Sequence, residues 1–171
     1  GVAEIREAFL EGLNQPFGMA LQGDTFYVGN TDGVVAFPYT SGQTRITAPA
    51  RRLTTYKPGG HWTRSLLASA DASKLYVGVG SLSNIGDNGF EAEEGRACIY
   101  ELDLASGKHR IFAAGLRNPV GLAWEPNTGA PSTRSIDALR RRSARTHSAS
   151  ARTARPRAPS PVSGKVSRPL P

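Results

Sequence analysis

Only one cysteine, Cys98, occurs in the 171 residues, so no disulfide can form within the chain. It stands between Ala97 and Ile99 in an apolar run, which predicts a small core residue. No Cys/His cluster has the spacing of a zinc site, and no stretch approaches the ~20 apolar residues of a membrane span. These absences exclude a disulfide-stapled fold and a zinc module, and they predict no membrane-spanning helix. We also find no pattern of a signal peptide.

The last quarter of the sequence has no aromatic residues and almost no acidic charge. Residues 1–130 carry 11 basic and 13 acidic residues, whereas residues 131–171 carry 10 basic residues and one acidic residue. Of the latter 41 residues, 32 are Arg, Ser, Pro, Ala or Thr, and none is Phe, Trp or Tyr. Such a segment buries too little apolar surface to offset the cost of ordering it. We therefore divide the chain into a folded domain, 1–130, and a disordered basic tail, 131–171, with one helical turn around 136–142.

The composition of the tail is typical of GC-rich coding sequence translated out of frame, and we expect a frameshifted or truncated gene product. A tail of this charge attracts polyanions without specificity. It has no aromatic side chains on which bases could stack, so we predict no specific nucleic-acid binding. A cationic protein dominated by this tail stays open as one hypothesis for the function.

Short apolar runs alternate with Gly, Asn, Asp and Pro in residues 1–130, which is typical of an all-β fold. Only Glu4–Leu10 shows a brief helical pattern. Asn30-Thr31-Asp32-Gly33 has the Asp-Gly pair of a tight hairpin. The predicted strands are 17–21, 25–28, 34–37, 44–47, 65–68, 75–79, 97–102, 110–113 and 120–124.

A motif with the pattern G-L-x-x-P-x-G-[ML]-A occurs twice, at residues 12–20 and 115–123. Halfway between the two copies lies His61-Trp62-Thr63-Arg64-Ser65-Leu66-Leu67, which gives a unit of roughly 50 residues. Four short strands per unit of this length indicate a propeller blade. We predict a partial β-propeller of about two and a half four-stranded blades. A β-sandwich with coincidental similarity is the alternative.

Each unit begins with a loop that leads into the innermost strand of its blade, and we call these loops the leading loops. They contain Gln15, His61–Arg64 and Arg117-Asn118. Since such loops lie at one mouth of a propeller channel, we expect these residues to converge although they are far apart in sequence.

Several consecutive motifs resemble the sorbosone dehydrogenase branch of the glucose/sorbosone dehydrogenase family. They are GLNQPFGMAL, DTFYVGNTDGVVAF, KPGGHWTRSLLAS, KLYVGVGSLSN, EEGRACIYELDLASG and GLRNPVGLAWEPNTG. The resemblance implies a six-bladed propeller enzyme that oxidises a sugar hydroxyl or a hydrated aldehyde. It further implies pyrroloquinoline quinone and calcium as cofactors, a small sugar-like substrate with an electron acceptor as partners, and a periplasmic or secreted location.

The resemblance also implies roles for three residues. His61 matches the family's catalytic histidine, which accepts the hydroxyl proton, a reaction that suits an imidazole near neutral pH. Arg117 matches a catalytic arginine that polarises the quinone carbonyl, and Arg117 and Asn118 together match the pair that binds the quinone. No residue is assigned to a metal.

Two departures from the family pattern count against activity of this chain. An aspartate that orients the histidine in relatives is replaced here by Ser81, which cannot stabilise imidazolium with a full charge. The later blades, with further quinone contacts and the calcium site, are not represented. We therefore expect cofactor binding to be impaired and the chain to be inactive. The open flanks of an unclosed ring invite aggregation or self-assembly.

Plainer interpretations stay open for several residues. Arg117 and Asn118 can simply cap a turn, and Trp62 and Arg64 can pack between blades. The acidic run 87–94 lacks the spacing of an EF-hand loop and is typical of a solvated hairpin. A non-catalytic propeller fragment that binds carbohydrate or protein is the alternative function.

Overall fold

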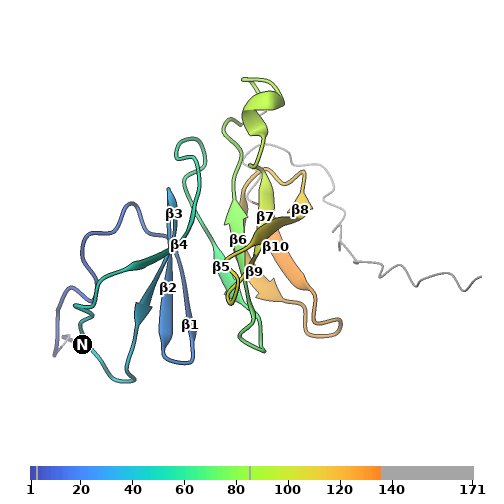
Figure 1. Ribbon diagram of the computed structural model, residues 1–171. Coiled ribbons are helices and arrows are strands. Elements are labelled where there is room, and N and C mark those ends of the chain that lie inside the picture. The colour runs from blue at the N-terminus through green and yellow to red at the C-terminus, as the bar shows by residue number, and fades with distance from the viewer. Residues whose placement is uncertain (3, 85, 136–171) are drawn as a thin grey trace, which may run out of the picture.

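The computed structural model describes residues 1–2, 4–84 and 86–135 as an all-β protein of ten strands and one short 3-10 helix (Figure 1). The elements are β1 Gly18–Gln22, β2 Thr25–Asn30, β3 Gly33–Pro38, β4 Arg51–Thr55, β5 Leu66–Ala68, β6 Lys74–Val79, η1 Glu91–Glu93, β7 Cys98–Asp103, β8 His109–Ala114, β9 Pro119–Trp124 and β10 Pro131–Ser135.

The strands form two four-stranded antiparallel sheets and a two-stranded one. Their orders are β1-β2-β3-β4, β5-β6-β7-β8 and β10-β9, so each strand pairs with its neighbour in sequence. The two larger sheets lie side by side in Figure 1, with β1 of the first facing β5 of the second. The prediction of a partial propeller is confirmed: β1–β4 form blade 1, β5–β8 form blade 2, and β9–β10 begin blade 3.

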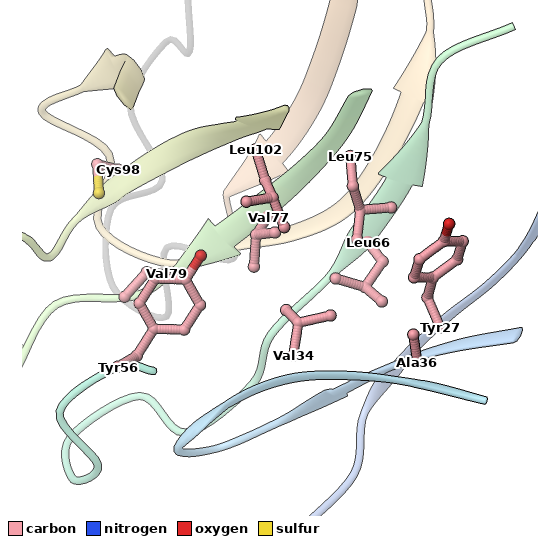
Figure 2. Close-up of a cluster of buried hydrophobic side chains, with 10 residues drawn as sticks. All are labelled: Tyr27, Val34, Ala36, Tyr56, Leu66, Leu75, Val77, Val79, Cys98 and Leu102. Atoms are coloured by element: carbon pink, nitrogen blue, oxygen red, sulfur yellow. The ribbon is translucent and has the colours of Figure 1, made fainter. Parts of the chain in front are cut away.

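Alternation of side chains within the strands creates the core between the blades. Figure 2 shows side chains of both blades that point toward one another across their interface. The buried residues of this core are Tyr27, Val34, Ala36 and Tyr56 of blade 1, and Leu66, Leu75, Val77, Val79, Cys98 and Leu102 of blade 2. Cys98 is fully buried, as expected for a small core residue. Burial of such side chains is the main stabilising contribution to folding.

The opposite face of blade 1 carries a second cluster built from Val28, Val35, Phe37 and Ile46. Phe9 and Leu10 of the N-terminal segment pack against it. Residues 4–10 are not helical, so that prediction was wrong. The segment is instead bonded to the residues of this cluster, since the Ile46 amide donates to the Phe9 carbonyl at 2.9 Å.

Two further expectations differ from the structure. The fourth strand of blade 1 is Arg51–Thr55 and not 44–47, because Ile46 is taken up by the second cluster and the strand pairs with β3 through a bulge. β10 lies beyond residue 130, where the folded part was expected to end, since it pairs with β9. The predicted helical turn at 136–142 and the predicted disorder of the tail fall outside the described residues, apart from residues 131–135.

No helix within the described ranges is long and apolar enough to cross a membrane.

Candidate functional site

The leading loops of blades 2 and 3 meet at the end of β6. The His61 amide donates to the Ser81 carbonyl at 3.0 Å, and the Ser81 amide donates to the Arg117 carbonyl at 2.8 Å. Ser81 therefore joins the two loops through its backbone, although they are more than 50 residues apart in sequence. Blade 1 contacts the leading loop of blade 2 through Gly18, the first residue of β1, whose amide donates to the Arg64 carbonyl at 3.0 Å.

Gly80 is the point of closest approach between the two loops. A Cβ on this residue would lie 2.5 Å from the His61 Cβ and 2.6 Å from the Asn118 Oδ1. Both distances are far below an ordinary contact, which is about 3.5–4.0 Å between carbon atoms. Only glycine at residue 80 allows His61 and Asn118 to lie against the same strand end.

The imidazole of His61 is held through Nδ1. This nitrogen lies 2.9 Å from the Ser81 carbonyl oxygen and 3.1 Å from the Ser81 Oγ. A carbonyl oxygen can only accept, so Nδ1 carries the proton and Nε2 is left as the proton-accepting nitrogen. The Ser81 hydroxyl donates to the Ser83 carbonyl at 2.6 Å and thus offers the ring an acceptor as well.

The role expected for Ser81 changes accordingly. From the sequence, its hydroxyl was to replace an aspartate; in the structure its main-chain carbonyl gives the shorter contact to the ring. A main-chain acceptor can orient an imidazole without a buried negative charge.

Arg117 reaches across to the segment after Ser81. Its Nε donates to the Asn84 carbonyl at 2.8 Å, and Nη2 donates to the Asn84 Oδ1. The Oδ1 of the next residue, Asn118, accepts from the Thr63 hydroxyl at 3.3 Å, which identifies its Nδ2 as the donor end of the amide.

Two buried arginines shape the loop that carries His61. Arg64 is fully buried, and its Nη1 donates to the carbonyls of His61 and Thr63 at 2.9 and 3.0 Å. Arg96 donates to the carbonyls of Lys57 and Gly59 at 2.9 and 2.6 Å. Burial and the nearby Arg96 lower the pKa of Arg64 to about 10, so Arg64 is cationic at neutral pH.

Trp62 is 42% exposed, and its ring lies edge-on to Phe17 of the leading loop of blade 1 at a centroid distance of 5.8 Å. Gln15 has a left-handed backbone with φ of 47° and is exposed. The contacts described above join the second and third loops directly, so the predicted convergence is clearest for these two.

Two cavities lie away from His61, Arg117 and Asn118. One of about 150 Å³ is lined by Tyr56, Arg96 and Tyr100 among others, and one of about 440 Å³ lies on the outer flank of blade 1. His61, Arg117 and Asn118 line neither cavity. No group of three or more His, Cys, Asp or Glu side chains among the described residues is placed to hold a metal ion.

Sequence reasoning missed three contributors to this geometry. They are the carbonyl of Ser81, the buried Arg96, and Glu93, whose carboxylate accepts from the Leu82 and Ser83 amides. Main-chain acceptors leave no signature in a sequence, Glu93 lies within the run 87–94 that resembles a solvated loop, and Arg96 follows that run directly.

One known family matches most of this chain. Residues 3–151 match the family described as TrAA12-like. The comparison with curated proteins found no match.

Three solved structures share the fold. The calcium structure of Trichoderma reesei carbohydrate-active enzyme family AA12 is 25% identical, with a TM-score of 0.59, over 68% of this chain and 32% of that one. The iodide structure of the same family is 24% identical, with a TM-score of 0.60 and the same coverage. The PQQ domain of pyranose dehydrogenase from Coprinopsis cinerea, in its holo form, is 19% identical, with a TM-score of 0.54, over 67% of this chain and 42% of that domain.

The chain spans about a third of the length of the AA12 structures. The match to the TrAA12-like family also shows that the assignment to the glucose/sorbosone dehydrogenase family was wrong. The motifs on which that assignment depended are the leading loops and hairpins of the propeller, which the AA12 fold shares.

Proposed function

The chain belongs to the TrAA12-like family, and on that premise we propose that it contributes the base and part of the quinone site of a carbohydrate-active oxidoreductase. The observation that carries the proposal is the meeting of His61 with the Arg117-Asn118 loop at Gly80 and Ser81. A solved relative is named as the PQQ domain of a pyranose dehydrogenase, which supports a quinone cofactor and a pyranose-type sugar as substrate.

The chemistry of the donor set fits pyrroloquinoline quinone. This cofactor presents carbonyl and carboxylate oxygens, which need cationic and hydrogen-bond donors. Arg117 supplies a planar guanidinium, and Asn118 supplies an amide nitrogen at the adjacent position. When bound, the quinone supplies the acceptor for the hydride that leaves the sugar carbon.

His61 accepts the proton from the sugar hydroxyl at Nε2. The proton stays on Nδ1, where it is hydrogen-bonded to the Ser81 carbonyl at 2.9 Å, which keeps the ring in this tautomer and leaves Nε2 as the accepting nitrogen. When His61 becomes imidazolium, the carbonyl and the Ser81 hydroxyl oxygen, at 3.1 Å, both face the positive charge with oxygen lone pairs.

Arg117 stabilises negative charge that develops on the cofactor side of the site. Its Nε is held by the Asn84 carbonyl at 2.8 Å, so the guanidinium plane is fixed before any ligand arrives. A fixed donor costs no reorganisation during the reaction, which is the basis of electrostatic catalysis.

Calcium is assigned no residue in this proposal. Calcium takes several oxygen ligands, usually with carboxylates among them, and the described residues contain no such group. A periplasmic or secreted location stays a prediction.

Titration of the full chain with pyrroloquinoline quinone, followed by quenching of tryptophan fluorescence, tests the proposal. We expect saturable binding that R117A weakens by about tenfold or more, because a charge-assisted hydrogen bond is lost. R51A, at an exposed arginine on β4, is the matched control and should bind as the wild type does. An absence of binding, or an equal loss in both variants, would contradict the proposal.

A further inference from the structure

The segment from Ser81 to Asn84 connects the two side chains to which function was assigned above. At its start, the Ser81 carbonyl and hydroxyl hold the His61 ring. At its end, the carbonyl and side chain of Asn84 hold the guanidinium of Arg117. The relative placement of His61 and Arg117 therefore depends on the shape of this segment, which we call the bridging segment.

The middle of the bridging segment is held by one carboxylate. The Leu82 amide donates to both oxygens of Glu93, at 2.8 and 3.1 Å, and the Ser83 amide donates to Oε1 at 3.2 Å. The Ser83 hydroxyl adds a weaker contact to Oε1 at 3.4 Å. Adjacent amides that point at the same carboxylate form a small anion nest, whose geometry fixes the backbone of both residues.

Arg96 restrains the same region from the other side. It is 6% exposed, and its Nη2 donates to the Gly59 carbonyl at 2.6 Å and lies 3.4 Å from the Ser81 carbonyl. The cation of Arg96 thus contacts carbonyls, whereas the anion of Glu93 contacts amides. Glu93 and Arg96 consequently hold both the amides and the carbonyls of the backbone next to His61.

The acidic run that was predicted to be a solvated loop is therefore only partly solvated. Glu91 and Glu94 are exposed, while Glu93 on the short helix η1 is turned toward the bridging segment. Spacing along the sequence cannot distinguish these three glutamates, and only their contacts do.

We propose that Glu93 is a positioning residue, which sets the orientation of His61 and Arg117 through the bridging segment. The functional meaning of this orientation rests on the function proposed above, whereas the structural coupling does not. If the carboxylate is removed, the Leu82 and Ser83 amides lose their acceptor and turn toward water. The Ser83 carbonyl, which accepts from the Ser81 hydroxyl, and Asn84, which accepts from Arg117, then move with the backbone.

The test is nuclear magnetic resonance of the ¹⁵N-labelled full chain without cofactor. In the wild type we expect the neutral His61 ring to carry its proton on Nδ1, and the Arg117 Nε–H to exchange slowly with solvent. In E93A the His61 signals should move toward the Nε2–H tautomer, which free histidine prefers. Hydrogen exchange at the Leu82 amide should become about tenfold faster, because its charge-assisted bond to Glu93 is lost. Exchange at the Arg117 Nε–H should also become faster, because its acceptor on Asn84 moves with the bridging segment.

E91A removes an exposed carboxylate from the same helix and is the matched control, for which we expect no change in either signal. His61 is assigned by the loss of its signals in H61Q. A His61 tautomer and an Arg117 exchange rate in E93A that equal those of E91A would overturn the proposal.

Should E93A fail to fold, the pair E93Q and E91Q replaces it, because glutamine keeps the length of the side chain. A larger tautomer shift in E93Q than in E91Q supports the proposal, and an equal one overturns it. The readouts need no quinone, so a failure here leaves the titration with R117A intact. Conversely, a tautomer shift in a chain that binds no quinone would support the coupling through Glu93 and contradict the proposed function.

Discussion

Substitution of Gly80 by alanine separates the two loops that form the candidate site. The added Cβ would lie 2.5 Å from the His61 Cβ and 2.6 Å from the Asn118 Oδ1, so each neighbour must retreat by about 1 Å to reach normal contact. The Asn118 amide can rotate away, but the His61 Cβ is tied to a backbone whose amide donates to Ser81. Overpacking of this kind costs about 1–3 kcal/mol. A loss of about 2 kcal/mol lowers the Tm of a chain of this size by about 4–8 °C.

Thermal unfolding and the side-chain resonances of His61 and Asn118 measure the effect. Gly107 provides the control, because a Cβ there meets nothing within 4 Å while its φ of +71° makes alanine strained. We expect G107A to lose about 1 kcal/mol of stability without any change at His61 or Asn118. If G80A leaves both resonances and the Tm unchanged, the two loops do not meet at residue 80 and the reasoning is refuted.

Three further predictions concern buried polar groups. Replacement of Ser81 by alanine removes the hydroxyl contacts but not the carbonyl, so S81A should lower the free energy of unfolding by about 1–2 kcal/mol while His61 keeps its Nδ1–H tautomer; loss of that tautomer would contradict the geometry. Burial acts to raise the pKa of Glu101, but hydrogen bonds from Lys74, Arg110 and Tyr76 outweigh it and lower that pKa. The carboxylate therefore stabilises the fold above its ordinary pKa of about 4.3, and this stability is lost as the pH falls through the lowered value. E101Q should unfold about 2 kcal/mol more easily at pH 7 and show a shallower decline in Tm in acid, whereas a decline as steep as that of the wild type would count against this assignment. Burial raises the pKa of the Cys98 thiol to about 11, so iodoacetamide at pH 8 should alkylate it at least about a hundredfold more slowly than free cysteine, and an equal rate would show that the site is open.

The sheets could be predicted from sequence because their signals are local. Apolar alternation identified eight of the strands to within two residues at either end, and Asp32-Gly33 and Ser106-Gly107 identified two of the turns. The repeated motif at residues 12–20 and 115–123 also gave the phase of the blades. The repeat placed His61 and Arg117 in the leading loops of successive blades, which led to the expectation that they lie near one another, and their loops do meet at Ser81.

What could not be predicted depends on contacts across the fold. Ile46 looked like part of a strand because it is apolar and β-branched, but it packs on the second cluster of blade 1. The strand Arg51–Thr55 was missed because four of its five residues are polar; pairing with β3 and the packing of Leu53 against the core place it in the sheet. In the same way, Glu93 and Arg96 act through main-chain groups of other loops, which no residue pattern reveals.

The family assignment failed for a related reason. The motifs quoted for it correspond to hairpins and leading loops, which belong to the propeller architecture that this chain shares with the AA12 structures. They therefore indicated the architecture more reliably than the family.

The most direct test of the central claim is a crystal structure of the full chain soaked with pyrroloquinoline quinone. We predict that the quinone lies on the Arg117-Asn118 loop, with the Nε2 of His61 facing it and the Nδ1 on the Ser81 carbonyl. A structure in which the His61 and Arg117 loops lie apart, or in which the quinone binds elsewhere on the chain, would contradict the account.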